Sequence, residues 1–106
     1  MEKELFEKIR SQYCQEHSGV TVGKMMSSDA MLYNNNVFAF FSRKNKMVFK
    51  LGKSFDPVEQ SFEVNVFNPF KKRGPLNGWF EVPITEKDQW WTLTETALEL
   101  IKQETK

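Results

Sequence analysis

The sequence has few of the residues that usually mark an enzyme or a secreted protein. Among its 106 residues there is one cysteine, Cys14, and one histidine, His17. A single cysteine excludes an internal disulfide, and the first residues lack the apolar run of a signal peptide. We therefore expect a protein of the reducing cytoplasm.

The chain also lacks long apolar runs and phosphate-binding loops. Its longest apolar run, residues 37–41, is far shorter than the roughly 20 residues that cross a bilayer. The five glycines are scattered, and none forms a Gly-x-Gly-x-x-Gly or Walker-type pattern. With 40% hydrophobic and 27% charged residues, the composition is typical of one globular domain spanning residues 1–106. We expect no bound cofactor and no membrane partner.

Charge is distributed unevenly, although the net charge is only +1. Residues 37–78 contain eight Lys or Arg against three Asp or Glu, whereas residues 79–106 contain three against six. The small net charge argues against strong non-specific attraction to nucleic acid, but the middle of the chain is basic and its end is acidic.

Apolar spacing predicts a helix at each end of the chain. Over residues 2–16, apolar side chains recur at helical intervals while charged ones face away. Near the other end, Thr85 with Asp88 three residues later resembles a capping box. The apolar positions that follow it predict an amphipathic final helix: Trp90, Leu93, Ala97, Leu98 and Ile101.

A third, shorter helix is predicted in the middle of the chain. Asp56 is a good helix-capping residue, Pro57 suits the first helical position, and Glu59 follows within the first turn. These signals predict a helix over residues 56–64.

The strongest strand signal is a hairpin. Residues 37–41 and 46–51 flank the polar loop 42–45. Because residues 37–41 are apolar at every position, both faces of that strand should be covered, which places it at the centre of the sheet. Further strands are predicted at 20–25 and 79–82, and the asparagines at 34–36 predict a chain reversal.

Together these elements predict an α+β fold. We expect two layers, with an antiparallel sheet of four to five strands and helices on one face. The predicted order along the chain is α-β-β-β-α-β-β-α.

Several short motifs occur in an order that resembles a known family. They are Lys24-Met25-Met26, Phe38-Ala39, the strand 47–51, Gly78-Trp79 and Val82-Pro83. From Lys24 onward the chain resembles the amino-terminal domain of the TfoX family, known for a bacterial regulator of natural competence. The resemblance implies a two-layer α+β fold and a bacterial regulatory protein, and many family members are small proteins of unassigned role.

The sequence departs from that family in two respects. Ser27 and Asp29 stand where the family usually has glycine and proline, so the turn there should be built differently. Competence regulators also carry a second, helical domain, which we do not expect here. The competence role is therefore not transferred to this chain.

Residues that could support catalysis or metal binding are sparse. Cys14 and His17 are three residues apart, but a structural zinc site needs four ligands and a cysteine nucleophile needs an oriented base. We interpret them as a helix end with a buried or half-buried thiol. Glu95 and Glu99 are typical of a solvated helix face, and Glu81 of an outward-facing strand residue. The residues predict no catalytic or metal site and favour a non-enzymatic protein, although an enzyme is left open.

The basic segments are the best functional lead. Cations at the hairpin tip and in the later loop lie close in sequence to aromatic residues, a mixture that can track a phosphate backbone and stack bases. Lysines on edges and loops also commonly prevent aggregation. Because adjacent helical residues point about 100° apart, burying both Trp90 and Trp91 is harder than burying one, and we expect Trp91 to be the partly exposed ring. The candidate nucleic-acid or partner-binding residues are Arg43, Lys44, Lys46, Lys71, Lys72, Arg73 and Trp91.

Three functions follow as hypotheses. The leading one is a non-enzymatic interaction or regulatory module that acts through a protein partner or self-association, as a dimer for example. The alternative is a nucleic-acid-binding module that uses the two basic clusters. A third is a small ligand-binding protein or enzyme with an aromatic pocket near Glu81.

Overall fold

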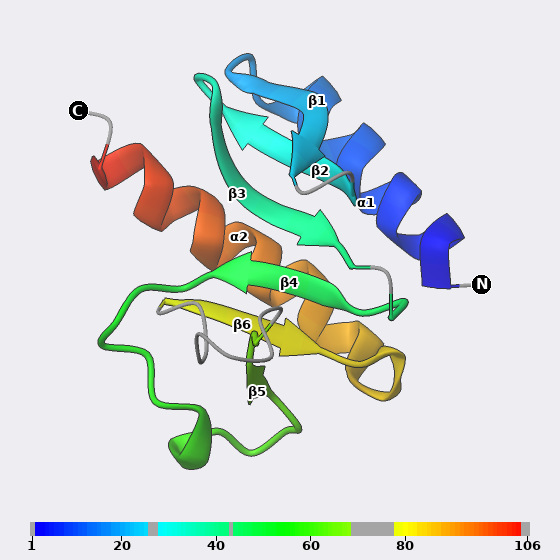
Figure 1. Ribbon diagram of the computed structural model, residues 1–106. Helices are drawn as coiled ribbons and strands as arrows, with labels where there is room; N and C mark the ends of the chain where they lie inside the picture. The colour runs from blue at the N-terminus through cyan, green and yellow to red at the C-terminus, as the bar shows by residue number, and fades with distance from the viewer. Residues whose placement is uncertain (1, 26–27, 43, 69–77, 105–106) are drawn as a thin grey trace.

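The computed structural model describes residues 2–25, 28–42, 44–68 and 78–104. These residues form two α-helices and six β-strands (Figure 1). In chain order the elements are α1 (Glu2–Glu16), β1 (Val20–Met25), β2 (Ser28–Tyr33), β3 (Asn36–Phe41), β4 (Met47–Lys50), the 3-10 turn η1 (Pro57–Glu59), β5 (Asn65–Val66), β6 (Trp79–Val82), the 3-10 turn η2 (Ile84–Glu86) and α2 (Lys87–Glu104).

The strands make one antiparallel sheet in the order β1-β2-β3-β4-β6-β5. Both helices lie on the same face of this sheet (Figure 1). Phe41 of β3 contacts both of them, since its ring stacks on Phe6 of α1 at 5.4 Å and meets Trp90 of α2 edge-on at 6.5 Å. The predicted α+β class, with an antiparallel sheet and helices on one face, is confirmed, but the sheet has six strands instead of four to five.

Both terminal helices bury the apolar positions that their spacing predicted. Helix α1 has the predicted bounds and buries Phe6, Ile9 and Tyr13. Helix α2 buries every apolar position named for it. Its start differs from the prediction, because Thr85 lies inside η2 and α2 begins at Lys87, so Thr85 is not the residue that directly precedes the helix.

Strand β3 is central, as predicted, and it is buried from both sides. A β-bulge lies at Phe38, since Met31 of β2 pairs with Ala39 while the next residue, Leu32, pairs with Val37. A bulge turns two successive side chains toward one face. Phe38 and Ala39 therefore both join the core under the helices.

The opposite face of the sheet carries a second apolar cluster. Ala30, Phe40, Val48 and Phe67 are buried there, and Phe40 is only 1% exposed. Phe40 meets the ring of Phe67 edge-on at 5.2 Å and the ring of Trp79 at 5.7 Å. Aromatic packing therefore stabilises this face as well as the face under the helices.

The predicted reversal after β2 is a tight turn. Asn34 and Asn35 adopt positive φ angles of 49° and 70°, the conformation that two-residue hairpin turns require and that asparagine tolerates. The preceding apolar segment is a full strand, β2, which the sequence indicated only as a short stretch.

The predicted helix over 56–64 is wrong. Asp56 does cap a turn, because its side chain accepts a hydrogen bond from the backbone N–H of Val58 at 2.9 Å. The turn stops after three residues, and none of them is buried. The capping signal is local, whereas a helix is held mainly by an apolar face. Here Val58 in the turn is exposed, and the residues that contact the core, Phe62 and Val64, lie beyond the turn.

Val58 supplies a test of that correction, because it is 88% exposed in η1. Replacing it with alanine should change the free energy of unfolding by less than about 0.5 kcal/mol. In a packed helix the same change would cost roughly 1 kcal/mol or more. Urea unfolding of the two proteins measures the difference in free energy of unfolding, and a large loss would support a packed helix at this position.

Candidate functional site

The only cysteine and the only histidine do not form a reactive pair. Burial raises the pKa of the Cys14 thiol above its usual value, and the nearby Arg10 guanidinium only partly opposes this. His17 lies just after α1, where its ring stacks on Tyr13 with centroids 5.3 Å apart. The thiol is therefore less ionised than a free cysteine, the opposite of what a nucleophile needs.

Slow labelling of Cys14 should show this directly. Because a raised pKa leaves less thiolate at neutral pH, iodoacetamide should react with Cys14 several-fold more slowly than with free cysteine. Unfolding the protein in urea should restore the ordinary rate. Mass spectrometry over time measures both rates, and a folded-state rate above that of free cysteine would indicate an activated thiol.

Carboxylates in the described parts of the chain do not gather into a site. Glu95 and Glu99 lie exposed on α2. No group of three or more His, Cys, Asp or Glu side chains among those residues is placed to hold a metal ion.

Burial, followed by the charges of Glu95 and Glu16, raises the pKa of Tyr13 to about 12, so its hydroxyl stays protonated at neutral pH. Neither described helix combines the length and apolar character of a membrane span.

The predicted basic hairpin tip is partly neutralised. Lys46 places its Nζ 3.7 Å from Oε1 of Glu81 on β6, whose side chain is 16% exposed. Glu81 therefore pairs with a cation on the face away from the helices. Lys44 is exposed, and its backbone N–H donates to the Ser42 hydroxyl at 3.3 Å. Arg43 lies outside the described residues.

The second basic cluster, Lys71, Lys72 and Arg73, also lies outside the described residues. Whether the two clusters share one surface therefore stays a prediction. Trp91 is partly exposed, as predicted, and the buried part of its side chain packs on the core beneath the helices. Its neighbour Trp90 is completely buried, with its indole N–H donating to the Val82 carbonyl at 3.1 Å.

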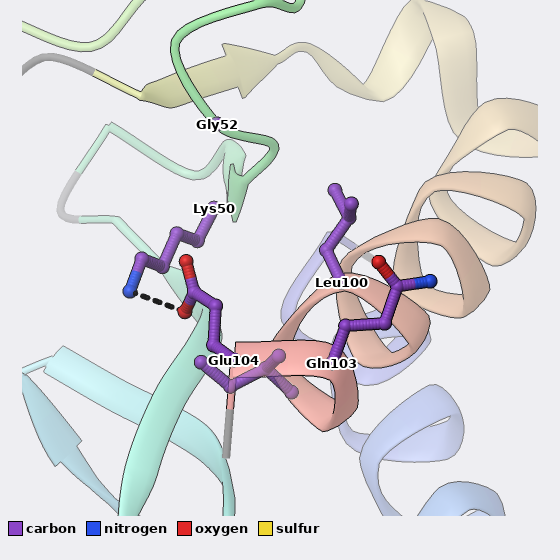
Figure 2. Close-up of a pocket in the computed structure, with 6 residues that line it drawn as sticks. Lys50, Gly52, Leu100, Gln103 and Glu104 are labelled. Carbon is purple, nitrogen blue, oxygen red and sulfur yellow. Dashed lines mark hydrogen bonds and ion pairs between the residues drawn. The ribbon is translucent and has the colours of Figure 1, made fainter. Parts of the chain in front are cut away.

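A shallow recess of about 220 Å³ lies between the end of β4 and the end of α2. Lys50 of β4 and Glu104 of α2 meet at this recess, with Nζ and Oε2 3.0 Å apart, and Leu100 and Gln103 of the same helix lie beside them (Figure 2). The two charged groups at this recess satisfy each other, and none of the described residues that line it is aromatic. It therefore differs from the aromatic pocket near Glu81 that a ligand-binding protein would require.

The edge strand β1 is an accessible hydrogen-bonding feature. It has six residues and lies at the end of the sheet, where β2 is its single partner among the described strands. Val22, in its middle, is 62% exposed, which is high for a large apolar side chain on a strand. Gly23 beside it is close-packed from the β2 side, since an added Cβ would lie 2.5 Å from Leu32.

The backbone groups of β1 that face outward follow from the β1–β2 register. Asn34 donates its N–H to the Gly19 carbonyl at 3.1 Å, just before the first strand pair. Opposed residues of antiparallel strands alternate between bonded and non-bonded pairs. The bonded pairs therefore fall at Thr21 and Gly23, and the peptide groups of Val22 and Lys24 point away from β2.

Proteins usually protect such an edge, and the two ends of this sheet differ in that respect. Strand β5, at the far edge, has only two residues, which is one common form of protection. The only charge on β1 is Lys24, and its ammonium turns back to Asp29 on β2 at 3.1 Å. That pairing lowers the pKa of Asp29, mainly through the hydrogen bond from Lys24. Strand β1 is left long, regular and open.

Comparisons of the chain with protein-family models, curated proteins and solved structures found no match. The interpretation of the site therefore depends on its geometry. Sequence reasoning identified β1 as a strand but missed it as a site, because its place at the edge depends on how distant strands order in the sheet. One sequence signal could have indicated an edge site: the apolar residue Val22 lies in the middle of a predicted strand that contains a single charged residue.

Proposed function

We propose that this protein is a non-enzymatic interaction module that binds a protein partner by strand addition at the β1 edge. The observation that supports it is the open edge itself, where the peptide groups of Val22 and Lys24 point outward and Val22 is 62% exposed. Strand addition uses such groups, with main-chain hydrogen bonds giving affinity and alternate side chains giving specificity.

The other hypotheses have less support among the described residues. Nucleic-acid binding depends on free cations, whereas Lys46 pairs with Glu81, which leaves Lys44 as the exposed candidate lysine among the described residues. Catalysis depends on an activated group, whereas the pKa of Cys14 is raised. A regulatory role of the TfoX amino-terminal type is compatible with an interaction module and stays a prediction.

Site-specific crosslinking in the native host tests the proposal. A photoreactive phenylalanine analogue at position 22 would sit on the edge, and the same residue at position 58 would serve as the control, because Val58 is also exposed but lies in η1. We expect a discrete crosslinked protein product from position 22 and none from position 58. No product at 22, or the same products at both positions, would contradict the proposal.

A further inference from the structure

The free backbone groups of β1 match those of a second β1 strand turned antiparallel. With Val22 opposite Val22 of the second copy, each N–H can donate to the other's carbonyl. Two residues further along, Lys24 lies opposite Val20 of the copy and can donate to its carbonyl. The N–H of Val20 is not required, since it already donates to the His17 carbonyl at 3.1 Å.

The charges at the two ends of β1 are complementary in the same arrangement. At the Lys24 end, Lys24 and Lys3 lie 3.1 and 3.9 Å from Asp29, and Arg10 also acts on that carboxylate, so three cations share this one carboxylate. At the Val20 end the chain has just left α1, whose last turn contains Glu16 and no basic residue. A helix C-terminus also carries partial negative charge.

An antiparallel pair brings Lys24 of each copy toward the end of α1 of the other, where Glu16 lies. A parallel pair would instead place like charges together. The same arrangement packs the exposed Val22 side chain against its own copy, which removes both from water. Charge and apolar surface therefore favour one orientation.

The arrangement also closes on itself. Once the two β1 edges are joined, each sheet ends at β5, which has only two residues. A contact that uses the same surface on both copies forms a two-fold dimer, whereas a head-to-tail contact would continue into a fibre. The sheet geometry thus limits assembly to two chains.

We propose that the partner bound at β1 is a second copy of this chain, joined antiparallel about a two-fold axis at Val22. This rests on the proposed function, because it names the occupant of the same edge. The two six-stranded sheets then become one continuous sheet across the dimer.

Solution mass tests the dimer, with proline at position 22 as the blocking change. Proline removes an N–H, and at position 22 that N–H points away from β2, so Val22→Pro should leave the β1–β2 pairing intact. Val22→Thr keeps both the N–H and a β-branched side chain and is the matched control. Sedimentation equilibrium should give wild type and Val22→Thr about twice the 12.5 kDa chain mass. Val22→Pro should dimerise at least about tenfold more weakly.

A charge variant keeps the proposal testable if the proline variant fails to fold. Glu16 is exposed, and its carboxylate accepts a hydrogen bond from the neighbouring Gln12 side chain at 3.1 Å. Glu16→Lys should leave the fold intact and weaken the dimer roughly threefold or more at low salt. Added salt should weaken the wild-type dimer and narrow that difference.

The outcomes separate this inference from the proposed function. If the wild-type protein stays monomeric at all concentrations up to about 1 mM, its dimerisation Kd is too weak for a specific contact. That result overturns the proposed dimer. If position 22 then still crosslinks to a different protein in the native host, the interaction module stands with another occupant. If Val22→Pro and Glu16→Lys both fold and both dimerise as strongly as the wild type, the contact lies elsewhere and the inference is overturned. A monomer without crosslinks at 22 overturns both.

Discussion

Replacing Trp90 with alanine is expected to lower the free energy of unfolding by about 3 to 5 kcal/mol. Trp90 is completely buried, meets the Phe41 ring at 6.5 Å and donates its indole N–H to the buried Val82 carbonyl. The change would leave a cavity between α2 and the sheet and an unpaired carbonyl. Since small domains have only about 5 to 15 kcal/mol of stability, the variant should be close to unfolded at room temperature.

Urea unfolding followed by far-UV circular dichroism measures that loss. Trp90→Phe is the matched control, because it keeps an aromatic ring in the site but removes the N–H donor. Its loss should be smaller, about 1 to 3 kcal/mol. If Trp90→Ala costs less than about 1 kcal/mol, the packing of α2 on the sheet described here is incorrect.

Replacing Phe40 with alanine should cost a similar amount, about 3 kcal/mol or more, although Phe40 lies on the face away from both helices. Its ring is buried between Phe67 and Trp79. An ordinary two-layer α+β domain has a solvated outer face, where such a change would be nearly neutral. The expected loss therefore tests the second apolar cluster specifically.

Phe40→Leu serves as the control for that measurement. It preserves most of the apolar volume and should cost less than about 1.5 kcal/mol. The two variants can be compared by thermal and urea unfolding under the same conditions. Equal and small losses for both would show that the outer face is not packed.

Much of the fold could be predicted because local signals and tertiary packing agree. Residues 2–16 form α1 within the predicted bounds, because the apolar stripe that predicts the helix is also the stripe that packs on the sheet. Likewise, uninterrupted apolar character at 37–41 predicted a central strand, and β3 is buried on both faces. In these segments the same apolar pattern predicts both the secondary structure and the surface that packs in the core.

The predictions fail where a local sequence signal and the contacts between distant residues do not agree. Asp56 and Pro57 gave a valid capping signal, but nothing in the fold buries a helix there, so the turn ends after η1. The bulge at Phe38 depends on the pairing of β2 with β3, which residue patterns do not encode. The insertion of β6 between β4 and β5 brings together strands far apart in sequence.

The candidate site was missed for the same reason. A strand's sequence shows which of its residues alternate between faces, but not whether a second neighbour will pair with it. Val22 and Lys24 became candidates only when the register placed their peptide groups on the open side of β1. The basic residues favoured from sequence are local features, and Lys46 proved to be paired with Glu81 across the sheet.

Residue-resolved amide hydrogen exchange of β1 across a range of protein concentrations tests the central claim most directly. The account predicts that the amides of Thr21 and Gly23 are protected at every concentration, because they bond to β2. It predicts that Val22 and Lys24 exchange rapidly in dilute solution and become protected together as concentration rises. Fast exchange at Val22 and Lys24 under all conditions, while the protein forms its complexes, would contradict it.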